Sequence, residues 1–151
     1  VIGAGTVLDA PTARIAILNG AQFVVSPAFD AETIRLCNRY RISCMPGTTT
    51  LQGVVQALEA GADIVKIFPA GRLGSGYVSD IQAPLGKMPL MVVGGIGTSN
   101  VQEYFAAGAS FAGIGSGIFL KEDILNENEE GIRGSIAAME EKMKSMEEKE
   151  S

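Results

Sequence analysis

A lysine stands in the middle of an apolar stretch of this sequence. Lys66 lies in the run Ile64-Val65-Lys66-Ile67-Phe68-Pro69-Ala70, which is typical of a buried strand that ends at a proline. Burial of an unpaired ammonium group is costly, so it lowers the pKa of a lysine and favours the free amine. A free amine can attack a carbonyl carbon and form a Schiff base. Lys66 is therefore a candidate nucleophile; the alternative is a strand-end lysine whose ammonium group reaches solvent.

Residue types that are missing or scarce narrow the chemistry further. The 151 residues include no histidine, which excludes Ser-His and Cys-His catalysis and the commonest zinc sites. The two cysteines, Cys37 and Cys44, have no metal-ligand spacing, and we expect them to be buried thiols. The sequence predicts no metal site and no cofactor, which leaves proton transfer to carboxylates, hydroxyls, lysine or water.

The charge pattern points to a small-molecule ligand. The net charge is −5 and no run is rich in Lys or Arg, so nothing favours nucleic acid or an anionic membrane as a partner. No apolar stretch approaches the roughly 20 residues that span a bilayer, and no signal peptide is visible. We expect a cytoplasmic protein, with the reservation that a targeting segment would lie upstream of Val1.

The elements that must position Lys66 are visible as repeated βα units. Apolar runs that end in Gly, Ser or Pro predict six strands, at residues 1–5, 23–27, 42–47, 64–69, 90–95 and 111–116. Continuous apolar strands imply a parallel sheet that is buried on both faces. Apolar residues at helical spacing predict intervening helices around residues 13–17, 34–37, 54–58 and 101–105.

The turns and the chain end complete the predicted architecture. Gly20, Gly61 and Gly108 stand where helix C-caps would precede a strand, which suggests a repeated unit. Such repeats favour a TIM (β/α)8-type barrel, with a doubly wound sheet as the alternative. We expect a single domain over residues 1–151. A final helix and charged tail from about residue 126 would carry one apolar stripe, made of Ile132, Ile136, Met139, Met143 and Met146.

The ends of the predicted strands resemble those of the 2-keto-3-deoxy-6-phosphogluconate and 4-hydroxy-2-oxoglutarate aldolases. The resemblance runs from Val1 to about Phe119 and depends on several motifs taken in order. These are Gly3-Ala4-Gly5-Thr6-Val7, Val25-Ser26-Pro27, Met45-Pro46-Gly47 followed by Thr48-Thr49-Thr50, Lys66 to Ala70, Gly94-Gly95-Ile96 and Gly115-Ser116.

The resemblance implies a metal-independent class I aldolase of carbohydrate metabolism. Such an enzyme interconverts a 2-keto-4-hydroxy acid with pyruvate and an aldehyde. Lys66 matches the Schiff-base lysine of the family, and Thr6 matches the threonine near the pyruvate carboxylate. Pro27 and Phe68 match the apolar walls that keep water from the lysine. By resemblance we also expect a homotrimer.

Glycines that close the last two strands predict a phosphate site. Backbone N–H groups of Gly94, Gly95, Gly115 and Ser116 would bind the phosphate, because a Cβ there would block its approach. The alternative is that these glycines serve only tight turns. Residues 98–100 read as a helix N-cap and Arg72 as a solvated loop residue.

The chain departs from the family pattern in two ways. It covers about six βα units, the third to the eighth strand, so the family's acid/base glutamate and carboxylate-binding arginine would lie before Val1. Asp63 and Glu59 are not expected to replace them. Val93 stands where many members carry threonine.

We expect a partial record of a longer protein, with a truncated chain completed by another copy or partner as the alternative. A non-catalytic fragment or assembly subunit and another phosphate-binding barrel, an isomerase or synthase, remain the competing functions.

Overall fold

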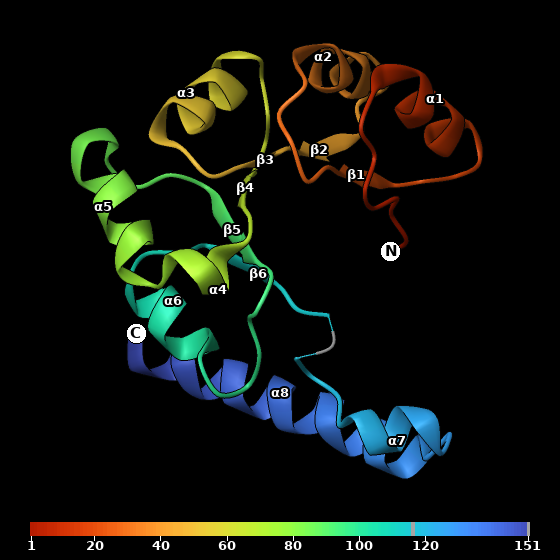
Figure 1. The fold of residues 1–151 in the computed structure, drawn as a ribbon, viewed down its shortest axis with the longest axis vertical. Helices are drawn as coiled ribbons and strands as arrows, with labels where there is room; N and C mark the ends of the chain where they lie inside the picture. Colours follow the sequence, from red (N-terminus) through yellow and green to blue (C-terminus); the bar gives the residue numbers. More distant parts are fainter. Residues whose placement is uncertain (116, 151) are drawn as a thin grey trace.

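The computed structural model describes residues 1–115 and 117–150 and consists of short parallel strands between helices (Figure 1). The strands are β1 (Phe23–Val25), β2 (Ser43–Met45), β3 (Gly47–Thr48), β4 (Val65–Ile67), β5 (Leu90–Val93) and β6 (Phe111–Gly113). The helices are α1 (Ala10–Leu18), α2 (Ala31–Tyr40), α3 (Leu51–Glu59), α4 (Ala70–Leu73), α5 (Gly76–Leu85), α6 (Val101–Ala106), α7 (Lys121–Leu125) and α8 (Glu129–Glu150).

The strands follow one another across the sheet in sequence order. β1 pairs with β2, and β3 to β6 form a second set in the order β3-β4-β5-β6, with every pair parallel. A doubly wound sheet would instead reverse direction from its first strand, so the order is that of a (β/α) barrel. The sheet does not close within the described residues: β1 and β6 remain apart (Figure 1).

One face of the sheet lies under helices. Figure 1 shows α1, α2 and α3 side by side over the first strands, whereas α5, α6 and α8 lie beside the last ones. The strand residues that point to the helices are fully buried: Val24, Cys44, Val65, Ile67, Leu90 and Val92. On the opposite, concave face, the strand residues are buried only at the centre, where Lys66 and Met91 are each 8% exposed, whereas Phe111 is 44% exposed. The prediction of burial on both faces is confirmed for β4 and wrong for the outer strands, because the sheet is open there.

Two predicted strands differ from the structure. Residues 1–5 form only an isolated bridge between Ala4 and Val24, so the strand predicted there is wrong. The run 42–47 divides at Pro46 into β2, which pairs with β1, and β3, which pairs with β4. Proline has no N–H to donate to a ladder, so the two pairings meet on either side of it.

The helices agree with the sequence where apolar spacing was clear. The four predicted helices are present as α1, α2, α3 and α6, and Gly20, Gly61 and Gly108 precede strands with φ of 94°, 93° and 102°. Helices α4, α5 and α7 were not predicted. α5 contains Pro84 and begins at Gly76, residues that ordinarily signal a break.

The last helix covers the end of the sheet with part of its apolar stripe. Met139 is buried in the main core and Met143 packs against it, but Ile136 is 40% exposed. Both cysteines are fully buried thiols, as expected. None of the helices within the described residues combines the length and apolarity that a membrane span requires.

Candidate active site

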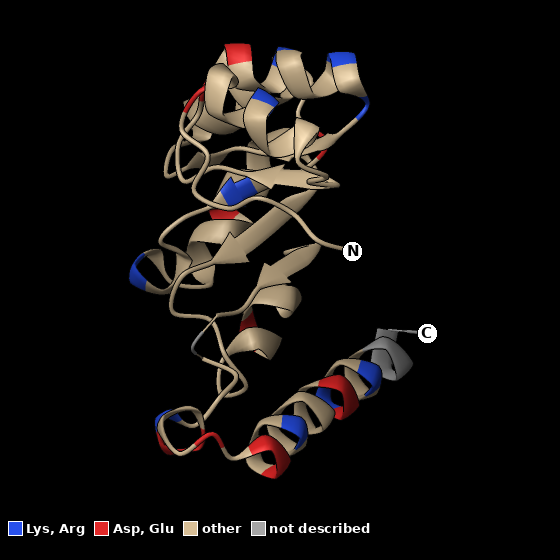
Figure 2. Cartoon of the chain, turned by 90° about the vertical axis from the view of Figure 1, so that its right-hand side faces the viewer, with Lys and Arg blue, Asp and Glu red and all other residues tan. Residues whose placement is uncertain are grey.

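Lys66 is the one charged residue in the six strands, and it lies at the centre of the sheet. Figure 2 shows the other Lys, Arg, Asp and Glu residues on helices and loops, with the strands otherwise uncharged. Its neighbours across the sheet are Gly47 and Met91, and its side chain is 8% exposed. Burial lowers the pKa of Lys66 below its ordinary value of 10.5, because water cannot solvate the ammonium form. The shift increases the share of the neutral amine, which is the form that can attack a carbonyl.

The ring of Phe68 covers the lysine amine. The Nζ atom of Lys66 lies 4.6 Å from the centroid of the Phe68 ring, two residues along the same strand. A ring face attracts an ammonium group weakly, but it also takes the place of water. Loss of hydration dominates here, since burial is the cause of the lowered pKa. The apolar wall predicted from the sequence is thus in contact with the nucleophile.

The segment after Lys66 is held against the glycine turn that follows β5. The N–H of Gly71 donates to the carbonyl of Gly94 at 2.8 Å. Gly94 has a φ of 87°, and a Cβ there would lie 2.9 Å from the Phe68 ring. Only glycine combines this left-handed backbone with so close an approach. The structure therefore brings Lys66, Phe68 and Gly94 together.

The glycine turns enclose a cavity of about 390 Å³ beyond β5 and β6. Its lining residues are Val93, Gly94, Gly95, Ile96, Gly97, Ser99, Gly113, Gly115 and Gly117. A Cβ on Gly97 would lie 2.5 Å from the Gly117 carbonyl, so the two turns pack backbone to backbone. Within residues 1–115 and 117–150, no acceptor is found for the N–H groups of Gly95 and Ile96. Such groups suit an anion. Ser116 lies outside the described residues.

Thr6 and Pro27 lie on the far side of β2 and β3 from the lysine. The N–H of Val7 donates to the Val25 carbonyl, so Thr6 lies beside the end of β1. Thr6 is exposed and has a φ of 59°, an unusual backbone for a β-branched residue. A Cβ on Gly47 would lie 2.4 Å from the Pro27 carbonyl, so Pro27 borders the strand next to Lys66. Both residues share the site's edge of the sheet without belonging to the Lys66–Phe68–Gly94 contact.

Carboxylates are placed away from the amine. Asp63 is exposed before β4 begins, beside Asn38 and Arg41, and Glu59 ends α3. Burial is the only cause of the pKa shift of Lys66, without a contribution from a charged neighbour. Arg72 is exposed, as expected, but it lies on α4 instead of a loop. Among the described residues, no cluster of His, Cys, Asp or Glu could hold a metal ion.

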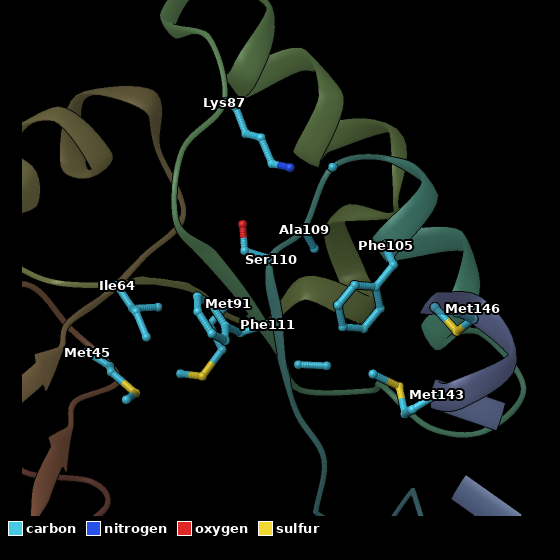
Figure 3. Close-up of a pocket in the computed structure, with 12 residues that line it drawn as sticks. Met45, Ile64, Lys87, Met91, Phe105, Ala109, Ser110, Phe111, Met143 and Met146 are labelled. Carbon is cyan, nitrogen blue, oxygen red and sulfur yellow. The ribbon is translucent and has the colours of Figure 1, made fainter. Parts of the chain in front are cut away.

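A second cavity, of about 620 Å³, is separate from these groups. Figure 3 shows it near the beginning of β6, with Met45, Ile64 and Met91 on one side and Met143 and Met146 of α8 on the other. Lys87 is the one charged residue in its lining. The residues predicted to do chemistry are not part of this lining, so we do not place the site there.

Tyr104 of α6 and Asn100, just before α6, contribute to the site in ways the sequence did not reveal. The hydroxyl of Tyr104 donates to the carbonyl of Ala70 at 3.1 Å, in a buried position just after the lysine strand. Asn100 was interpreted as a helix N-cap, but its side chain makes no cap hydrogen bond and instead bonds to Gly95 and Gly97. The one sequence signal for these two roles is the spacing itself: Asn100 follows the glycine turn, and Tyr104 follows four residues later.

The family model "KDPG and KHG aldolase" matches residues 1–134. The chain is 35% identical over 119 residues to the 2-dehydro-3-deoxy-6-phosphogalactonate aldolase of Escherichia coli (strain K12). This match covers 78% of the chain and 58% of the relative. The chain thus spans less than two thirds of the length of that relative.

Solved structures agree with the family match. The structure described as native KDPGal has a TM-score of 0.82 and 30% identity, with 95% of this chain and 70% of that one covered. A KDPG aldolase from Legionella pneumophila, with pyruvate captured as a covalent carbinolamine, has a TM-score of 0.80 and 28% identity. There the match covers 89% of this chain and 66% of the other.

Proposed function

The chain belongs to the KDPG and KHG aldolase family, and on that premise we propose that it takes part in class I aldol cleavage. The substrate would be a 2-keto-4-hydroxy acid, 2-keto-3-deoxy-6-phosphogluconate or 4-hydroxy-2-oxoglutarate, and the products would be pyruvate and an aldehyde. The observation that carries the proposal is the buried amine of Lys66, with its lowered pKa, in the centre of the sheet.

Lys66 acts as the nucleophile. Its neutral amine attacks the C2 carbonyl of the keto acid to form a carbinolamine, and loss of water gives a protonated imine. The imine accepts the electron pair of the C3–C4 bond as the bond breaks, while the C4 hydroxyl loses its proton and leaves as the aldehyde. The enamine that remains takes up a proton at C3. Hydrolysis of the imine then releases pyruvate and the free amine.

The other proposed residues bind the substrate and exclude water. Thr6 supplies a hydroxyl that donates to the carboxylate of the keto acid. Pro27 and Phe68 form apolar walls, and Phe68 is already in contact with the amine. The strained backbone of Thr6 supports its role, because such outliers cluster at ligand sites.

The glycine turns bind the phosphate of a phosphorylated substrate. Gly94, Gly95 and Gly115 line the cavity of about 390 Å³. The N–H groups of Gly95 and Ile96, which have no acceptor in the part of the chain that the structure describes, suit a phosphate there. We assign Ser116 to the same group by family pattern. Val93 adds an apolar side chain to the lining of this cavity.

The chain as a whole represents one barrel domain, residues 1–151, with strands three to eight of a TIM-type barrel. We assign neither Asp63 nor Glu59 as the acid/base carboxylate, because Asp63 lies before β4 begins and Glu59 ends α3. The proposed assembly is a homotrimer and the proposed compartment is the cytoplasm, both on the ground of family.

A turnover assay tests the proposed function. Pyruvate release from each of the two substrates would be measured with the chain and with Lys66→Arg, which keeps the charge but removes the nucleophile. Release by the chain and none by the variant supports the aldolase. Equal release by both would contradict it.

The second candidate function is ligand binding without turnover. The open sheet and the absence of a nearby carboxylate among the described residues favour it. In that case the keto acid would form the imine on Lys66 without release of an aldehyde.

A further inference from the structure

Asn100 bridges the turn that lines the glycine cavity. Its Nδ2 atom donates to the carbonyl of Gly95 at 2.9 Å, and its Oδ1 atom accepts from the N–H of Gly97 at 2.9 Å. One side-chain amide therefore satisfies a carbonyl and an N–H two residues apart. The backbone N–H of Asn100 also donates to the Gly97 carbonyl, at 3.2 Å.

The turn depends on an outside support for its shape. Gly94 and Gly95 both have positive φ, of 87° and 75°, and consecutive glycines have the largest conformational freedom to lose on folding. The Gly94 carbonyl is held by Gly71, and the Gly95 carbonyl by Asn100. Both carbonyls are engaged on the protein side, and the N–H groups of Gly95 and Ile96 have no acceptor among the described residues, so they can bind a ligand.

We propose that Asn100 is a positioning residue that holds the Gly94–Gly97 turn in its phosphate-accepting shape and so sets the preference for phosphorylated substrates. The inference rests on the proposed function, because it assigns the turn to the substrate phosphate. Asn100 acts through the glycines and does not touch the substrate. Its loss therefore weakens the phosphate end of the site and leaves the Lys66 end unchanged.

The chain offers a matched control for this residue. The Nδ2 atom of Asn38 donates to the Gly61 carbonyl at 3.0 Å, between α2 and the turn after α3. Gly61 also has positive φ, and this contact lies before β4 begins, on the side of the sheet opposite the glycine cavity. Asn38→Ala thus removes the same kind of bond from a glycine turn that the proposal does not involve.

Two readouts on the same protein test the proposal. Inorganic phosphate would be titrated while the amide signals of Gly95 and Ile96 are followed by NMR, and pyruvate trapping on Lys66 by borohydride would be measured in parallel. For Asn100→Ala we expect phosphate binding at least about tenfold weaker, as for the loss of hydrogen bonds that orient a charged group. The trapping rate should stay within about twofold of the parent. Asn38→Ala should change neither quantity.

Several results would overturn the inference. Phosphate affinity of Asn100→Ala equal to that of Asn38→Ala would show that the amide does not shape the turn. Parallel loss of phosphate binding and trapping, at an unchanged melting temperature, would show that Asn100 supports the whole site and not the phosphate end. A parent chain with no phosphate-dependent shifts would show that the turn is not an anion site. By contrast, failure of trapping in the parent would reject the aldolase and leave the phosphate test of Asn100 valid.

Discussion

The N–H of Gly71 donates to the carbonyl of Gly94 at 2.8 Å, and this bond joins the segment after Lys66 to the turn of the glycine cavity. Gly94 in turn packs against Phe68, whose ring lies over the lysine amine. The two ends of the proposed substrate site are therefore in direct contact through backbone atoms. A change at this contact should affect both the nucleophile and the phosphate turn.

Gly71→Ala should damage this contact. A Cβ at Gly71 would lie 2.9 Å from the Gly94 carbonyl oxygen and 3.0 Å from the Gly95 Cα, and both are backbone atoms. We expect a loss of about 1–3 kcal/mol in the free energy of unfolding, as for other overpacked sites, together with weaker phosphate binding. Gly76→Ala is the control, because a Cβ there meets no atom within 4 Å. Denaturant unfolding of both variants measures the difference, and equal effects would contradict the close packing.

Tyr104→Phe should destabilise the segment after the lysine strand. The variant leaves the buried Ala70 carbonyl without its partner, which costs about 1–3 kcal/mol. Tyr77→Phe removes a hydroxyl that donates to the Thr49 carbonyl in an exposed position, where water can replace it. We therefore expect the larger loss of thermal stability for Tyr104→Phe. The same melting temperature for the two variants would argue against a structural role of the buried bond.

The lowered pKa of Lys66 has a consequence for stability. Between the folded pKa and the ordinary value of 10.5, the unfolded chain binds a proton that the folded chain does not, so stability rises with pH across this window. Below the window, the folded protein carries the full cost of a buried charge. Lys66→Met should therefore raise the free energy of unfolding at neutral pH, and the gain should vanish above pH 10.5. A gain that is the same at every pH would show that the pKa is not lowered.

Thr6→Gly should separate backbone strain from ligand binding. Glycine accepts a φ of 59° without strain, so the variant should be as stable as the parent or up to about 1 kcal/mol more stable. Without its hydroxyl, however, half-maximal trapping should need several-fold more pyruvate. Glu127→Gly is the control, because Glu127 has a φ of 51° and lies beyond the glycine turns, just before α8. If Glu127→Gly altered the pyruvate requirement as much, the role proposed for Thr6 would be wrong.

The sequence predicted the fold where local signals and tertiary structure agree. Strands β4 and β5 were predicted because apolar runs there end at Pro69 and Gly94. Pairing with the neighbouring strands preserves the extended conformation that these runs favour locally. The division of residues 42–47 at Pro46 depends on which strand pairs on each side, and this is a tertiary property. The open concave face likewise depends on whether the sheet closes, which no local pattern reports.

The candidate site was predicted in its residue types and only partly in its geometry. A lysine inside an apolar strand was a sufficient signal for the nucleophile, because the cost of burial is local. Asn100 and Tyr104 could not be found in the same way. Each acts through a hydrogen bond to a backbone carbonyl that lies on another part of the chain or turn, at Gly95 and Ala70. The Tyr104 bond exists only after the fold has brought α6 against the segment that follows β4, and the Asn100 bonds, although local, require the shape of the glycine turn.

Covalent trapping on Lys66 tests the central claim most directly. The folded chain would be treated with pyruvate and borohydride, and the adduct located by peptide mass spectrometry. Lys66→Arg would serve as the negative control, and Lys87→Arg as the control for reaction at an exposed lysine. The account predicts one reduced pyruvyl adduct, on Lys66, which persists in Lys87→Arg and is lost in Lys66→Arg. A folded chain that forms no adduct, or forms it equally at exposed lysines, would contradict the claim that Lys66 is the Schiff-base nucleophile.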